Sequence, residues 1–165
     1  MEYLKAKLIR ALVDHFENDD RRIEHALRVL AWTEKLLESE PADREIAPAV
    51  AVLHDVGIKE AEAKHGTSSA RLQEEYGPSI AKRILANIGF PGDKIEAVCA
   101  IVGKHHTKNG VDSPDFRILW DADLLVNTAD SPQLDMEKMA GKIDNIFATE
   151  TGRILARREF AKARL

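Results

Sequence analysis

Residues 49–57 read AVAVLHDVG, and this stretch carries the strongest indications of both fold and chemistry. Its first five residues are apolar and predict an apolar helix, at the end of which stand His54 and Asp55. Neighbours in a regular helix point about 100° apart, but the backbone can turn at a helix end and let both side chains converge on one point. Burial of an imidazole and a carboxylate is costly unless something compensates it, and a metal ion would do so.

The sequence on either side of this stretch predicts further helices. Apolar residues recur every four positions in residues 3–17, at Leu4, Leu8, Leu12 and Phe16. Aspartates, glycines and prolines stand where helices should begin or end. We therefore expect an all-α bundle of about seven to nine helices, at residues 3–17, 20–39, 43–55, 68–76, 77–88, 93–102, 114–126, 134–149 and 152–164. Pro48 lies inside the third segment, so that helix begins later or bends there. No alternating run of β-branched residues predicts a strand.

The composition limits the class of protein. A chain of 165 residues with 44% hydrophobic and 32% charged residues fits one folded domain, over residues 1–165. Its formal net charge of −4 argues against a nucleic-acid polymer as the main partner. The single cysteine, Cys99, suits a reducing cytoplasm. We see neither a signal segment nor an apolar run of about 18 residues, so we expect a soluble cytoplasmic protein that does not enter a membrane.

Two further segments place polar groups in apolar surroundings. Arg22, His25 and Arg28 recur every three residues and share one face of the second expected helix. Asp121 and Asp123 stand inside the apolar segment WDADLL at residues 120–125, where an unpaired carboxylate would be unusual. A histidine alone in a helix usually reflects packing or exposure. Histidines and carboxylates together form a mixed nitrogen and oxygen set, which suits manganese, iron, cobalt, nickel or zinc.

The order and context of these residues resemble the HD-domain metal-dependent phosphohydrolases. The resemblance covers about residues 20–127 and leaves further helices at 134–164. It rests on His25, on His54-Asp55 in the segment LHDVG and on Asp123 in the segment DADLL. It implies that His25, His54, Asp55 and Asp123 bind a divalent metal ion, while Asp121 supports the site or caps a helix.

The resemblance leaves a second metal ion open. Family members with two ions use further histidines and let the aspartate of the doublet bridge both, which here implicates His65, His105 and His106. In the branch that hydrolyses dinucleoside tetraphosphates, a histidine precedes Gly-Pro at the start of a helix. Here Tyr76 precedes Gly77-Pro78, so we expect one ion and leave two open. Without a second ion these histidines would contact phosphate or lie exposed.

The activity that the resemblance implies is hydrolysis of a phosphate ester or anhydride by a metal-activated water. The substrate would be a nucleotide or another small phosphorylated metabolite. The expected catalytic residues are Asp55, His105 and His106, of which a histidine steadies the phosphate or protonates the leaving group. Cations near the motifs are expected to bind substrate, with solvated helix ends as the alternative: Arg28, Lys59, Lys104 and Lys108.

Three alternatives concern chemistry and assembly. Some HD-type proteins hold two irons and activate oxygen, which needs the complete set of six ligands. Others are non-catalytic sensors or scaffolds, but such members usually lack a ligand. Near the C-terminus a basic stripe fits a solvated helix face or a homodimer contact: Arg153, Arg157, Arg158 and Lys162.

Overall fold

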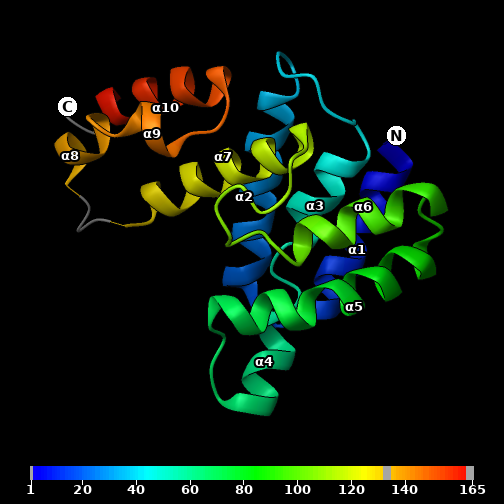
Figure 1. Ribbon diagram of the computed structural model, residues 1–165. Coiled ribbons are helices and arrows are strands. Elements are labelled where there is room, and N and C mark those ends of the chain that lie inside the picture. Colours follow the sequence, from blue (N-terminus) through cyan, green and yellow to red (C-terminus); the bar gives the residue numbers. More distant parts are fainter. Residues whose placement is uncertain (1, 132–134, 163–165) are drawn as a thin grey trace.

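The computed structural model describes residues 2–131 and 135–162 (Figure 1). Within these ranges the chain is helical and has no strand, which confirms the all-α prediction. The helices are α1 Glu2–Phe16, α2 Asp20–Leu36, α3 Ile46–Leu53, α4 Ile58–His65, α5 Ala70–Ile88, α6 Gly92–Val102, α7 Pro114–Ala129, α8 Met136–Ala140, α9 Ile143–Ile146 and α10 Glu150–Lys162. None of these helices combines the length and apolar character that a membrane crossing requires.

Helix α3 forms the centre of the bundle. Every residue from Ala47 to Leu53 is buried, and α3 packs against α1, α2, α6 and α7. The helix begins at Ile46 and not at 43, because the Asp43 carboxylate accepts hydrogen bonds from the backbone N–H groups of Glu45 and Ile46. Pro48 therefore falls in the first turn, where its missing N–H costs no helical hydrogen bond.

The region after α3 differs from the prediction in two ways. Helix α4 was not predicted, because in its eight residues only Ile58 and Ala61 are buried and no clear periodicity results. Helix α5 is one continuous helix through Gly77-Pro78, where we predicted two. Gly77 is needed for close packing, since a Cβ atom there would lie 2.7 Å from the Cγ1 atom of Val102. Gly77 thus allows α5 to approach α6, and neither Gly77 nor Pro78 ends the helix.

The C-terminal segments lie along α7, on the side away from α5 (Figure 1). The predicted helix at 134–149 is replaced by the short helices α8 and α9, and residues 132–134 lie outside the described part of the chain. Phe147 adopts an extended conformation and ends α9. Helix α10 then begins at Glu150 instead of 152, and the predicted residues 163 and 164 also lie outside the described residues.

Candidate metal centre

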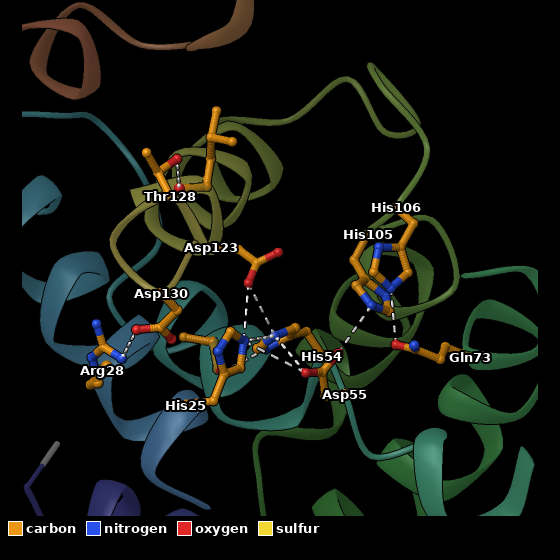
Figure 2. A network of polar contacts seen from close by, with 12 residues as sticks. His25, Arg28, His54, Asp55, Gln73, His105, His106, Asp123, Thr128 and Asp130 are labelled. Carbon is orange, nitrogen blue, oxygen red and sulfur yellow. Dashed lines mark hydrogen bonds and ion pairs between the residues drawn. The ribbon is translucent and has the colours of Figure 1, made fainter. Parts of the chain in front are cut away.

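Four side chains from α2, α7 and the turn between α3 and α4 converge in the middle of the bundle (Figure 2). His25 comes from α2, whose first turn is capped by the Asp19 side chain. The Nε2 atom of His25 lies 3.1 Å from Oδ1 of Asp123 and 3.3 Å from Nε2 of His54. Asp123 comes from α7, whose first turn is capped by the Ser113 side chain.

His54 is the residue that follows α3, and its ring is almost completely buried, at 1% exposure. Its Nδ1 atom lies 2.8 Å from the carbonyl oxygen of Ala51. Since a carbonyl only accepts, Nδ1 carries a proton and donates it, which orients the ring. The Nε2 atom then faces Oδ2 of Asp55 at 3.4 Å and Oδ1 of Asp123 at 3.7 Å. This is the way a metal-binding histidine is usually held by its second nitrogen.

The spacing of these atoms fits a shared metal ion. Ligand atoms about 2.1 Å from an ion lie about 3.0 Å apart along an octahedral edge and about 3.4 Å apart along a tetrahedral edge. The ligand atoms of His25, His54 and Asp55 lie 3.3, 3.4 and 3.6 Å from one another, and Oδ1 of Asp123 lies 3.1 Å from Nε2 of His25 and 3.7 Å from Nε2 of His54. Two nitrogen and two oxygen donors at these separations suit a divalent transition metal.

The pKa shifts of these residues also indicate a site for a cation. Burial by itself would lower the pKa of His54, but the negative charges of Asp55 and Asp123 outweigh it and raise the pKa to about 9. Burial would likewise raise the pKa values of Asp55 and Asp123, yet the adjacent imidazoles hold both below their ordinary range. The carboxylates of Asp55 and Asp123 therefore favour a positive charge at this centre. A metal cation would compete with the proton on Nε2 of His54, because both need the same lone pair.

A second group of side chains shares Asp55. Ligand atoms of Asp55, His105 and His106 lie within 4.8 Å of one another. His105 is buried, and its Nδ1 atom donates to the carbonyl oxygen of Val102 at 2.7 Å. Its Nε2 atom lies 3.4 Å from Oδ1 of Asp55 but has no hydrogen-bond partner. A buried, unpartnered nitrogen lone pair beside a carboxylate fits a second cation, with Asp55 between the two groups.

His106 is held by contacts with α5 that could not be predicted from the sequence. The Nε2 group of Gln73 on α5 donates to the carbonyl oxygen of Ser68, so its Oε1 atom faces Nε2 of His106 at 2.9 Å. Because this oxygen only accepts, Nε2 of His106 carries the proton. The carboxylate of Glu74 accepts hydrogen bonds from the backbone N–H of His106 and the hydroxyl of Thr107. A glutamine-glutamate pair in an amphipathic helix gives no signal of this role in the sequence.

Several residues predicted for the site lie elsewhere. His65 contacts the hydroxyl group of Tyr76 at 2.8 Å and belongs to neither group of ligand atoms. Lys59 pairs with Glu17, and Lys108 donates to the carbonyl oxygen of Asn145. Lys104 is exposed. None of these four lines the cleft described below. Lys59 and His65 lie on α4, and Lys104 and Lys108 lie in the loop before α7. Spacing in the sequence does not predict in which direction these segments point their side chains.

Asp121, the other carboxylate of the DADLL segment, points away from the centre. It is fully buried and accepts hydrogen bonds from the backbone N–H groups of Ala148 and Thr149 and from the Thr149 hydroxyl. Burial raises its pKa to about 6, although these hydrogen bonds oppose the shift. Asp121 therefore anchors to α7 the residues before α10, and Thr149, not Asp121, accepts the hydrogen bond from Gly152 in the first turn of α10.

A cleft of about 800 Å³ opens onto the centre. It exposes His25, Asp55, Asp123 and His106, whereas the buried His105 does not line it. Arginines lie along its rim: Arg21, Arg22 and Arg28. Arg28 pairs with Asp130 at 2.6 Å (Figure 2). Arg21, Gln73 and Asn127 also line this cleft and were not predicted as site residues. Of these, only Arg21 had a signal in the sequence, because it forms an arginine pair with Arg22.

Comparisons with known proteins agree with this geometry. The family model described as "HD domain" matches residues 22–128, the region that holds all of the converging side chains. The structure also resembles a crystal structure of a predicted HD superfamily hydrolase from an uncultured Thermotogales bacterium. The TM-score is 0.70 at 24% identity, over 96% of this chain and 86% of that one, so this likeness shows the fold. No curated protein matches the sequence. The family match over most of the chain shows that this protein belongs to the HD-domain superfamily, which includes metal-dependent hydrolases.

Proposed function

We propose that this protein hydrolyses a phosphate ester or anhydride of a small phosphorylated metabolite, with nucleotides as the first class to test. The observation that carries the proposal is the set of contacts of 3.1–3.7 Å among His25, His54, Asp55 and Asp123. These four residues would hold a divalent transition metal. When bound, such an ion supplies hydroxide at neutral pH and polarises a phosphoryl oxygen.

The protein's own residues would bind and orient the substrate. His106 lines the cleft, and burial together with the neighbouring His105 lowers its pKa, so its ring is neutral at pH 7. With Nε2 donating to Gln73, the Nδ1 atom of His106 is left as a hydrogen-bond acceptor that can receive and return a proton. Arg28 lies on the rim, where its guanidinium can bind phosphate after exchanging its contact with Asp130.

The lining of the cleft bears on the substrate. In the described part of the chain its walls carry charged, amide and hydroxyl side chains, the imidazoles of His25 and His106 and one isoleucine, Ile58, but no phenylalanine, tyrosine or tryptophan. A nucleotide would therefore be held by its phosphate and sugar, and its base would gain little from stacking. A panel of substrates should accordingly include sugar phosphates and other monoesters beside nucleoside mono-, di- and triphosphates.

The geometry favours hydrolysis over the two alternatives. The six-ligand set of a dinuclear iron oxygenase was expected to include His65, which contacts Tyr76 and belongs to neither group of ligand atoms. A non-catalytic scaffold would be expected to have lost a ligand. All four expected ligands of the first ion are in place: His25, His54, Asp55 and Asp123. The number of ions and their identity remain part of this proposal.

Metal analysis combined with phosphate release tests the proposal. The protein would be stripped with a chelator, reloaded with manganese, iron, cobalt, nickel or zinc in turn, and assayed for bound metal and released phosphate. We expect the Asp55→Ala variant to lose both metal and activity, because Asp55 contributes to both groups. Asp112→Ala is the matched control, since Asp112 is exposed and pairs with Arg117. Full metal content and activity in Asp55→Ala would contradict the assignment.

A further inference from the structure

The turn that carries Asp55 has to be held accurately. Helix α3 ends at Leu53 and α4 begins at Ile58, so residues 54–57 form a turn outside both helices. Asp55 uses its two carboxylate oxygens in different directions: Oδ2 faces His54 and His25, and Oδ1 faces His105. A small rotation of this turn would disturb contacts on both sides. The turn has backbone hydrogen bonds of its own, from the N–H of Val56 to the carbonyl oxygen of Leu53 and from the N–H of Ile58 to that of Asp55, and contacts from neighbouring helices add to them.

The ring of His15 contacts the backbone of this turn from the side of α1. Its Nε2 atom lies 2.9 Å from the carbonyl oxygen of Val56, the residue after Asp55. Val56 is fully buried, and among the described residues no backbone N–H group outside the helices reaches that carbonyl. The ring of His15 therefore supplies the hydrogen bond. Leaving such a buried carbonyl without a partner is unfavourable, because it has lost its hydrogen bonds to water.

Two further contacts confine the same turn. Lys59, in the first turn of α4, donates to the carbonyl oxygen of His15 and pairs with Glu17 at 2.6 Å. On the opposite side, a Cβ atom at Gly57 would lie 2.6 Å from the carbonyl oxygen of Gln73, so α5 is in direct contact with the turn. The Lys59–Glu17 pair is exposed and contributes little. The hydrogen bond from His15 is therefore the main polar link between α1 and the turn.

We infer that His15 is a positioning residue for the metal centre, acting through the carbonyl group of Val56 on the orientation of Asp55. The inference rests on the proposed function, because it assumes that Asp55 binds an ion. It adds a role for α1, which lies before the residues 22–128 that match the family model. His15 touches no ligand atom itself, so its removal should weaken metal binding without abolishing it.

The test compares three substitutions by titrating chelator-treated protein with Mn²⁺ in a calorimeter. His15→Leu removes the donor, and we expect Mn²⁺ affinity to fall by about tenfold, as is usual when a residue that orients a ligand is lost. His15→Gln places an amide N–H near the position of Nε2, and we expect it to retain affinity within about threefold of the wild type. His15→Asn is too short to reach Val56 and should behave like His15→Leu, which provides a second reading if the leucine variant does not fold.

Phe16→Leu separates positioning from a general loss of stability. Phe16 is the next residue of α1 and is buried in the core, so its truncation should lower the unfolding midpoint without changing Mn²⁺ affinity. Unchanged affinity in His15→Leu and His15→Asn would overturn the inference. So would a failure of His15→Gln to restore affinity, or an equal loss of affinity in Phe16→Leu. If wild-type protein bound no Mn²⁺, the proposed function would fail together with this inference, whereas the other outcomes overturn the inference alone.

Discussion

The side-chain oxygen of Gln73 lies 2.9 Å from the Nε2 atom of His106 and determines which nitrogen of that ring carries the proton. Because the amide of Gln73 is itself fixed by the carbonyl oxygen of Ser68, the arrangement is set before any substrate enters. His106 is the histidine of the HH pair that lines the cleft, while His105 lies beneath it. The two adjacent histidines therefore differ in both environment and expected role.

Removing the Gln73 side chain's polar atoms should reduce turnover. Gln73→Met keeps the volume but frees His106 to rotate and to change tautomer, so we expect kcat for phosphate release to fall about tenfold to 100-fold. The four residues of the first group are not touched, and bound metal at that group should stay constant by elemental analysis. Glu75→Gln serves as the control, because Glu75 lies on the same helix, is exposed and pairs with Arg71. An unaltered kcat in Gln73→Met would show that His106 does not act in the reaction.

The stability of metal-stripped protein should fall at alkaline pH. The pKa of His54 is raised from 6.5 to about 9, so the protonated ring stabilises the folded state. That stabilisation is complete below the unfolded pKa of about 6.5 and is lost as the pH rises through about 9. We expect the urea midpoint, measured with a chelator present, to be lower at about pH 9.5 than at about pH 6.5. His54→Gln should flatten this dependence, and a midpoint that rises with pH in the wild type would contradict the prediction.

The contact between Asp121 and the start of α10 should matter for stability and not for metal binding. Asp121→Ala leaves the backbone N–H groups of Ala148 and Thr149 without their buried acceptor, and we expect a loss of about 1–3 kcal/mol for each unpaired donor. Gly152→Ala tests the same contact from the other side, since a Cβ atom there would clash with Oδ2 of Asp121 at 2.1 Å. Denaturant unfolding measures both. Bound Mn²⁺ should remain at the wild-type level in whichever variant folds, and loss of metal at full stability would instead assign Asp121 to the centre.

The cations predicted for substrate binding should separate into two classes. Arg28 lines the cleft, so Arg28→Ala should raise KM by about threefold to tenfold, a moderate loss because the residue is exposed and already paired with Asp130. Lys59→Met and Lys108→Met should leave KM within about twofold, because these lysines face Glu17 and Asn145. Steady-state kinetics on one accepted substrate would distinguish the classes. A larger rise in KM for Lys59→Met than for Arg28→Ala would contradict the placement of the cleft.

Much of the fold could be predicted from the sequence because it depends on local patterns. The apolar run before His54 forms the central helix α3, and α7 begins at Pro114, the first residue of the helix expected at 114–126. Helix α4 and the continuity of α5 could not be predicted, because they depend on contacts with distant segments. Gly77, for example, predicts a helix boundary in the sequence, whereas in the structure it lies inside α5 and allows close packing against Val102.

For the candidate centre, the sequence by itself determined the residue types and their order: a histidine in an early helix, the His54-Asp55 doublet after an apolar helix and aspartates in a late helix. Only the tertiary structure decided which of these meet. Asp121 and Asp123 lie two residues apart and therefore point about 200° apart around α7, so only one can face His25. Packing of α7 between α2 and α10 turns Asp123 toward His25 and Asp121 toward Thr149. The contacts of His15 and Gln73 likewise join residues far apart in the chain, and no local pattern encodes such distances.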